Sequence, residues 1–207
     1  TGGETMTTTA PTAVRETAPA AVHEQTVPGF GTVAVRPLDP SGDAALVHGW
    51  VNEERARFWG MVGHTRETVR RIYAYVDSLD THHAYIVERD GTPVALFQTY
   101  QPEHDPVGEC YPVRPGDFGV HLLLAPADGE PAPGFTAGLI TALLGFVFAD
   151  PSRLRIVAEP DALNEKSIAR TLRTGFELGP QIDLPHKRAQ LVFLTREAVA
   201  QALAARS

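Results

Sequence analysis

One strand-like segment constrains this chain more than any other part of its sequence. Residues 117–126, DFGVHLLLAP, form an apolar run that a single histidine, His121, interrupts, and a loop rich in Pro and Gly follows. The next segment, 135–149, has large apolar side chains at helical spacing. Burying an imidazole among leucines is costly without a hydrogen-bonding partner. The segment therefore predicts a strand, a loop and a buried helix, with His121 either a satisfied core residue or part of a site.

The composition predicts one folded domain behind a tail. Hydrophobic residues make up 43% of the 207 residues, which is enough for a substantial core. Residues 1–30 are rich in Thr, Ala, Pro and Glu, and we expect them to be a disordered tail before a single domain at 31–207. Met6 is a candidate for the natural first residue, which would make residues 1–5 a remnant of expression.

Charge and cysteine content argue against several classes of function. A net charge of -7 with scattered Lys and Arg offers no basic surface for nucleic acid. The single cysteine, Cys110, has no partner for an internal disulfide and no spaced Cys/His set for zinc, so we expect no metal and a reducing, cytoplasmic location. The longest apolar run, 139–149, is about half a membrane span, and no secretory leader is evident, so we expect no membrane segment.

The rest of the chain alternates strand-like and helical segments. Strands are expected at 32–37, 83–88, 93–100, 117–124, 153–159, 176–178 and 188–194. Helices are expected at 43–50, 65–76, 135–149, 164–174 and 196–206. Asp90-Gly91 is typical of a hairpin turn, and Asn164 and Gly175 are typical of the two ends of a helix. This order of elements predicts a mixed α/β domain.

The order of elements and two sequence blocks resemble the GNAT superfamily of acyl-CoA N-acyltransferases over residues 32–195. The blocks are 117–150 and 157–168, VAEPDALNEKSI, the second followed by Gly175-Phe176. Shorter motifs at 50–52, 57–59, 119–121, 159–164 and 185–189 are similar to the siderophore-biosynthesis branch. That branch acylates amines or hydroxylamines of lysine, ornithine or cadaverine, and includes desferrioxamine- and aerobactin-type enzymes and mycobactin lysine acyltransferase. The resemblance implies a GNAT fold: a mixed, mostly antiparallel sheet with a splay between its two central strands and helices on both faces.

The resemblance also implies a catalytic pair. His121 and Asp161 would face each other across the acyl site and serve in substrate orientation and proton removal. As an alternative, an Asp before a helix is commonly a cap, a duty that Asn164 can share. Backbone groups of Leu123 and Leu124 would hold the pantetheine arm of the co-substrate like an added strand, and a backbone N–H there would hold the thioester oxygen.

The pyrophosphate of coenzyme A would bind backbone donors at the head of the long helix. The family pattern has Gln or Arg, two residues, Gly, any residue, and Gly or Ala. In this chain Pro131 stands in the first place and Thr136 in the last, so only Gly134 matches and the conformation of loop 127–136 stays open. The residues expected to bind coenzyme A are Leu123, Leu124, Gly134, Phe135, Thr136, Ala137, Asn164 and Ser167.

The acceptor is expected to bind the first helices. Aromatic and polar groups gather within 48–59, and aromatic faces suit an aliphatic diamine with a cationic far end. Packing in the core is the alternative for Trp50 and Phe58. The histidines at 64, 82, 83, 104 and 186 have no metal-ligand spacing and are expected on the surface. The residues expected to bind the acceptor are His48, Trp50, Asn52 and Trp59.

These features favour an acyl-CoA N-acyltransferase with acetyl-CoA or succinyl-CoA as co-substrate and no permanently bound cofactor. Its acceptor would be an N-hydroxylated diamine or amino acid, with N-hydroxycadaverine favoured on overall likeness, and its product a hydroxamate for a siderophore. One alternative is an acetyltransferase of another small amine, such as an aminoglycoside. The other is a non-catalytic acyl-CoA-binding module. No oligomeric state is predicted.

Overall fold

The computed structural model describes residues 18–129 and 132–204. These residues form one eight-stranded sheet in the order β1-β2-β3-β4-β5-β6-β8-β7. Neighbouring strands run antiparallel except β5 and β6, which are parallel. The strands are β1 (His23–Val27), β2 (Gly31–Pro37), β3 (His82–Arg89), β4 (Thr92–Tyr100), β5 (Asp117–Leu124), β6 (Arg155–Ala158), β7 (Glu177–Leu184) and β8 (Lys187–Thr195).

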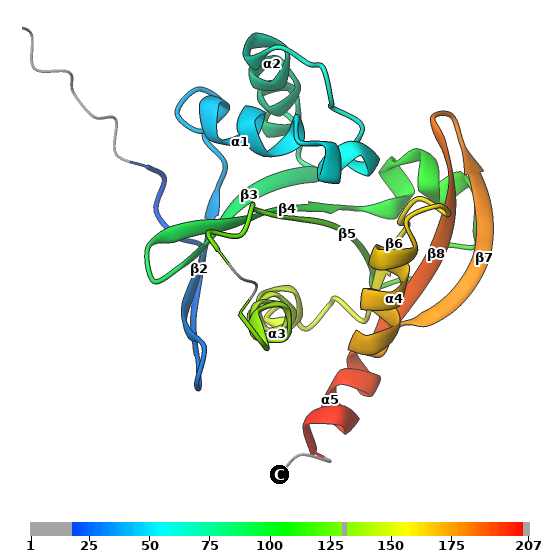
Figure 1. Ribbon diagram of the computed structural model, residues 1–207. Helices are drawn as coiled ribbons and strands as arrows, with labels where there is room; N and C mark the ends of the chain where they lie inside the picture. The colour runs from blue at the N-terminus through cyan, green and yellow to red at the C-terminus, as the bar shows by residue number, and fades with distance from the viewer. Residues whose placement is uncertain (1–17, 130–131, 205–207) are drawn as a thin grey trace, which may run out of the picture.

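Helices cover both faces of this sheet. Figure 1 shows α1 (Ala44–Val51) and α2 (Arg66–Asp77) over one face, and α3 (Phe135–Phe148) and α4 (Glu165–Thr174) over the other. A last helix, α5 (Arg196–Ala204), extends from the end of β8 (Figure 1). Short 3-10 segments are η1 (Glu54–Trp59), η2 (Pro102–His104) and η3 (Pro106–Glu109). The expected mixed, mostly antiparallel sheet with helices on both faces is confirmed.

Each helix layer has its own apolar core. Leu139, Leu143 and Val147 of α3 are buried against the sheet, one helical turn apart. On the opposite face, Val47 of α1 and Val69 of α2 are buried in a second cluster. The sheet is therefore sandwiched between helices, and its central strands carry apolar side chains on both faces.

The expected splay lies between β5 and β6. The two strands pair only near their starts, where Gly119 lies opposite Val157, and beyond that point β5 pairs with β4 alone among the described strands. An ion pair between buried Asp117 and partly buried Arg155 joins the starts of the two strands: Asp117 Oδ1 lies 2.7 Å from Arg155 Nε. Past this ion pair the strands separate, which leaves backbone groups of β5 without partners in a ladder.

The prediction of a disordered tail through residue 30 is wrong in its final part. β1 pairs with β2, from His23 opposite Val35 to Val27 opposite Gly31. The ring of Phe30, in the turn that follows, lies 5.4 Å from the ring of Phe135 at the start of α3. The composition of residues 1–30 did not predict this strand, because most of its stabilisation comes from the partner strand and α3 and not from its own few apolar residues. Residues 1–17, Met6 among them, lie outside the described part.

The strand expected at 176–178 is also longer than predicted. β7 continues to Leu184 through Gly179-Pro180, a pair of residues that is typical of turns. β7 is an edge strand, where a proline without an N–H costs no ladder bond. An irregular register between Leu178 and Gln181 accommodates the two residues. Within 18–129 and 132–204, no helix has both the length and the apolar character needed to cross a membrane.

Candidate active site

A cavity of about 510 Å³ lies at the splay and reaches both faces of the sheet. On the α1 and α2 face its walls come from η1 and from the turn between β7 and β8, including Trp59, His186 and Lys187. On the other face they come from α3 and α4, including Leu143 and Asn164. Consecutive residues of β5, from Val120 to Leu123, line it between these two halves. A molecule bound on one face can therefore meet a molecule bound on the other at the open edge of β5.

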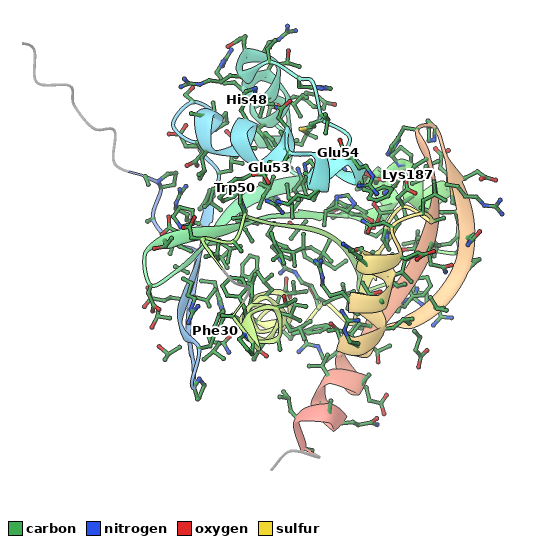
Figure 2. All side chains as sticks on the ribbon, viewed as in Figure 1. Phe30, His48, Trp50, Glu53, Glu54 and Lys187 are labelled. Atoms are coloured by element: carbon green, nitrogen blue, oxygen red, sulfur yellow. The ribbon has the colours of Figure 1, made fainter. Side chains whose placement is uncertain are left out.

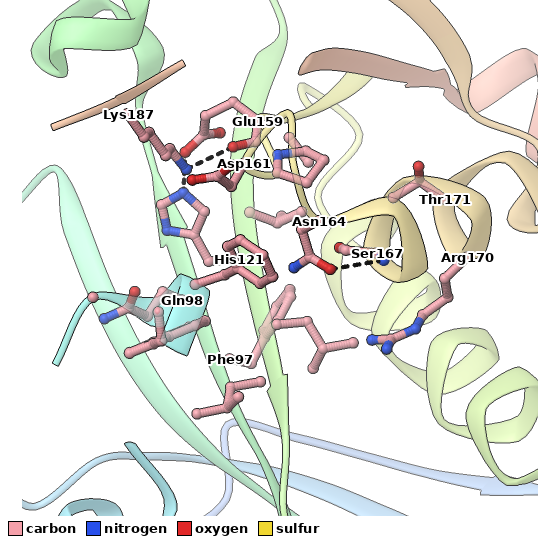
Figure 3. Close-up of a pocket in the computed structure, with 18 of the residues that line it drawn as sticks. Phe97, Gln98, His121, Glu159, Asp161, Asn164, Ser167, Arg170, Thr171 and Lys187 are labelled. Atoms are coloured by element: carbon pink, nitrogen blue, oxygen red, sulfur yellow. Dashed lines mark hydrogen bonds and ion pairs between the residues drawn. The ribbon is translucent and has the colours of Figure 1, made fainter. Parts of the chain in front are cut away.

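His121 stands at this junction with a buried carboxylate behind it. Its Nε2 is hydrogen-bonded to Oε1 of Glu159, just past the end of β6. Tyr100 donates its hydroxyl to the other oxygen, Oε2, at 2.5 Å. The Glu159 side chain is 3% exposed and that of His121 is 34% exposed. The carboxylate is thus sealed from solvent, while the imidazole opens into the cavity (Figure 3).

The charges around this carboxylate explain its ionisation. Burial acts to raise the pKa of Glu159, but the charge and hydrogen bond of His121, with help from Lys187 and Tyr100, lower that pKa below its usual range. Burial and the neighbouring Glu159 charge raise the pKa of Tyr100 well above that of an ordinary phenol. Glu159 is therefore an acceptor on both of its oxygens, and Tyr100 is a donor. In the neutral form of His121, Nε2–H therefore donates to Glu159 and Nδ1 carries no proton.

Aromatic rings and a lysine hold this group in place. The Tyr100 ring lies 5.1 Å from the His121 ring, and the Trp59 ring meets His121 edge-on at 6.2 Å. Trp59 donates Nε1–H to the hydroxyl of buried Tyr73 at 3.2 Å. Lys187 Nζ donates to the backbone oxygen of Glu159 at 2.6 Å, as Figure 3 shows. His121 and Glu159 are thus held by contacts with residues that are distant in the sequence.

Asp161 lines the cavity but is not the partner of His121. Its Oδ1 accepts the N–H of Leu163 at 2.9 Å, which is a turn contact at the start of α4. Its backbone forms an isolated bridge with Ala189 of β8. The position next to His121 that the sequence analysis assigned to Asp161 is held by Glu159. A catalytic role for Asp161 stays a prediction.

The register of β5 against β4 determines which backbone N–H and C=O groups of β5 face the gap beside β6. Ala125 donates its N–H to Val94 of β4 at 2.9 Å. Backbone groups of successive strand residues point in opposite directions, so those of Leu123 face β4 and those of Leu122 and Leu124 face the gap. The Leu123 side chain is buried in the core. Leu122 and Leu123 line the cavity, whereas Leu124 does not, and the Leu124 backbone oxygen accepts from Arg55 Nη1 at 2.8 Å. A contact of Leu123 and Leu124 with the pantetheine arm stays a prediction.

The residues expected to bind coenzyme A fall into two groups. Asn164 and Ser167 line the cavity, and Asn164 Oδ1 also caps α4 by accepting the Ser167 N–H at 3.1 Å. Thr171 and Arg170 of the same helix line it too. The start of α3, by contrast, is not part of its wall: Gly134, Phe135, Thr136 and Ala137 lie outside it. The pyrophosphate contact at these residues stays a prediction.

Three of the four residues expected to bind the acceptor lie away from the cavity. Trp50 is buried in the core under α1, and Asn52 Nδ2 donates to the backbone oxygens of His48 and His64. His48 Nε2 also contacts the oxygen of His64, at 3.1 Å. Figure 2 shows His48 and Trp50 at α1, far from Lys187 at the start of β8. His48 and Asn52 thus stabilise the turn after η1, and of the four residues only Trp59 lines the cavity.

Several residues that line the cavity or stand behind it were not predicted from the sequence. Glu159 lay within a quoted motif, but the neighbouring Asp161 was preferred. His186 is exposed, as expected, and it also lines the cavity with Lys187. The wall also includes Gln98 and Arg170, and Tyr100 stands behind it. A polar residue in an apolar strand, such as Gln98 beside Phe97, was the available signal. The described residues contain no cluster of three or more His, Cys, Asp or Glu that could hold a metal ion.

This chain is similar to known proteins in its domain family, in its sequence and in its structure. A family described as an acetyltransferase (GNAT) domain matches residues 39–184. The N(6)-hydroxylysine O-acetyltransferase of Escherichia coli is 27% identical over 168 residues, which cover 79% of this chain and 52% of that protein. The hydroxyornithine transacylase SID3 of Ajellomyces capsulatus is 31% identical over 153 residues, or 71% of this chain and 34% of that protein.

The chain therefore spans about half of one of these curated relatives and a third of the other. Among solved structures, the aminoglycoside acetyltransferase AAC(6')-Ib in complex with coenzyme A superposes with a TM-score of 0.71 at 27% identity. That alignment covers 84% of this chain and 99% of the other.

Proposed function

The chain belongs to the family of GNAT acetyltransferase domains, and from that premise we propose that it acylates a hydroxylamine with acyl-CoA as co-substrate. The acceptor is an N-hydroxylated diamine or amino acid, and the product is a hydroxamate for a siderophore. Relatives named for hydroxylysine and hydroxyornithine support this acceptor class. The observation that carries the proposal is His121, backed by buried Glu159, at the point where the two halves of the cavity meet.

In the proposed reaction the donor and acceptor approach from opposite faces of the sheet. Acyl-CoA lies on the side of α3 and α4, with its thioester at the open edge of β5, and the acceptor lies under η1 and Trp59. A hydroxylamine nitrogen is a weak base that arrives largely neutral, so positioning contributes much of the rate. The nitrogen attacks the thioester carbon, and the backbone N–H of Leu122 holds the oxygen as charge develops on it.

Proton transfer completes the step. A new C–N bond forms, His121 takes the N–H proton at Nδ1, and the C–S bond breaks to release coenzyme A as a thiolate that is then protonated. Glu159 holds the imidazole in this orientation and stabilises the imidazolium that forms. No covalent acyl-enzyme is needed. Acetyl and succinyl donors both suit the proposal, N-hydroxycadaverine is the favoured acceptor, and a cytoplasmic location stays a prediction.

The test is release of coenzyme A thiol from acetyl-CoA and succinyl-CoA. N-hydroxycadaverine is assayed beside cadaverine and lysine, with the wild type and His121→Ala. We expect turnover of the hydroxylamine and a fall of at least about tenfold in the variant, a loss of about 1.4 kcal/mol of transition-state stabilisation. Full activity of His121→Ala would contradict the assigned site, and absence of hydroxylamine turnover would contradict the assigned acceptor.

A second candidate function is acetylation of an aminoglycoside. The fold likeness to AAC(6')-Ib favours it, and an aminoglycoside included as another acceptor in the same assay distinguishes the two candidates. Binding of coenzyme A without thiol release from any acceptor would instead favour a non-catalytic module. The departure of loop 127–136 from the family pattern is the feature that points to this last alternative.

A further inference from the structure

Gln98 is an uncharged polar side chain in the acceptor half of the cavity. On β4 it lies directly opposite His121 of β5, and on its other side it lies opposite Ala84 of β3. Residues that face each other across a strand pair point to the same side of the sheet, with Cβ atoms roughly 4.5–5.5 Å apart. Both side chains line the cavity (Figure 3). A group bound to His121 is therefore within reach of the Gln98 amide.

The amide of Gln98 has no hydrogen-bonding partner in the described parts of the chain, and its neighbours are engaged elsewhere. Trp59 Nε1 donates to Tyr73, His121 Nε2 is bonded to Glu159, and Lys187 Nζ donates to the Glu159 backbone. Ala84 has no polar side chain to offer. An amide presents two N–H donors and one acceptor oxygen, so an unpaired amide beside a reactive histidine is available to a substrate. The ligand group that matches this amide is neutral and polar and can both donate and accept a hydrogen bond.

The hydroxyl of an N-hydroxylated amine has that chemistry. A hydroxylamine has two nucleophilic atoms, nitrogen and oxygen, and the product depends on which one faces the thioester carbon. A hydroxyl held by Gln98 is turned away from that carbon. The adjacent nitrogen then carries its proton toward Nδ1 of His121.

We propose that Gln98 binds the acceptor hydroxyl and thereby directs acyl transfer to nitrogen instead of oxygen. This inference rests on the proposed function and names the residue that distinguishes a hydroxylamine from an amine. In the reaction a C–N bond forms, the C–S bond breaks, the N–H proton goes to His121, and the hydroxyl keeps its own hydrogen. The product is a hydroxamate, whose two adjacent oxygens chelate Fe(III); transfer to oxygen would give an ester of the hydroxylamine without that oxygen pair.

The test compares wild type with Gln98→Leu, which keeps approximate size and removes the amide. For N-hydroxycadaverine and cadaverine, kcat/KM is measured by thiol release, and the hydroxamate share of the product is measured by ferric complex colour and mass spectrometry. We expect the hydroxylamine-to-amine ratio of kcat/KM to fall at least about tenfold, because discrimination by a hydrogen bond to a substrate hydroxyl is large. The share of product acylated on oxygen should rise.

The matched control is Gln181→Leu, because Gln181 is an exposed strand glutamine outside the cavity. It should keep the wild-type ratio and product. Gln98→Met serves as a second variant if Gln98→Leu does not fold, as judged by circular dichroism. An unchanged ratio and an unchanged product share in a folded variant would overturn the role of Gln98. A wild type that turns over cadaverine but no hydroxylamine would overturn the proposed function, and this inference with it.

Discussion

The chemistry proposed for this protein depends at the residue scale on one buried carboxylate. Glu159 binds His121 and Tyr100 with its two oxygens, so it orients the imidazole and opposes the positive charge that the imidazole gains. We predict that Glu159→Gln lowers kcat by about tenfold to a hundredfold, equivalent to about 1.4–2.8 kcal/mol, because the amide keeps the shape but not the charge. The measurement is kcat at saturating acyl-CoA and acceptor.

Tyr100→Phe is the comparison for this prediction, since it removes the hydrogen bond to Glu159 and keeps the charge next to His121. Its kcat should fall less than that of Glu159→Gln. If Glu159→Gln kept wild-type kcat while His121→Ala lost it, Glu159 would be a packing residue only.

At the element scale, an ion pair joins β5 and β6 at the closed end of the splay, where the two strands are still paired. The Asp117 side chain is 0% exposed; its oxygens contact Arg155 at 2.7 Å and accept the Tyr111 hydroxyl at 3.0 Å. Burial acts to raise the pKa of Asp117, but these bonds, chiefly that of Arg155, lower it overall. A lowered pKa in the folded state contributes stability that is present above the unfolded pKa and is lost as pH falls through the folded value.

We therefore predict that the free energy of unfolding decreases as pH falls below about 4, the usual range for Asp. Asp117→Asn should lower that free energy at pH 7 by about 3–5 kcal/mol, because partly buried Arg155 loses its charged partner. It should also weaken the acid dependence. Urea unfolding at pH 7, 5 and 3.5 measures both effects.

Asp183→Asn is the matched control, since Asp183 is 88% exposed and its contact with Arg188 is long, at 3.9 Å. Equal effects of the two variants would count against the proposed importance of the ion pair.

At the scale of the whole molecule, the cavity has one half on each face of the sheet. The half under α3 and α4 is the one proposed for the donor, the half under η1 is the one proposed for the acceptor, and the two meet at β5. This arrangement leaves room for both substrates to be bound together. We predict a ternary complex, with intersecting lines when initial velocity is plotted for several concentrations of each substrate. Protein incubated with acetyl-CoA alone should gain no acyl group by mass spectrometry.

Cys110→Ser is the control for this kinetic prediction. Cys110 is the single cysteine of the chain, and its residue is not part of the cavity wall. The variant should therefore keep the wild-type rate. Parallel initial-velocity lines with an acylated protein would contradict the ternary complex and point to a covalent intermediate.

Much of the fold could be predicted because its signals are local. Thr65 accepts the Thr68 N–H at the start of α2, Asn164 caps α4, and Gly175 ends α4 with a φ of 105°. The Asp90-Gly91 turn joins β3 to β4 as its residue types indicate. Each of these features depends on contacts within a few residues. β1 and the second half of β7 were missed because their stability depends on pairing with strands that local composition does not reveal.

By itself, the sequence determined which chemical groups reach the splay: a histidine within an apolar strand, acidic residues after the next strand, and a capped helix beside them. Only the tertiary structure decided their partners. Glu159 lies 38 residues from His121 and 59 from Tyr100 along the chain, yet it binds both. Asp161, two residues from Glu159, instead accepts the backbone N–H of Leu163. Likewise, Trp50 packs in the core and Asn52 bonds the backbone of a turn. Helical spacing and motif order specify a side chain's place along its element, whereas the packing of distant segments decides what that side chain meets.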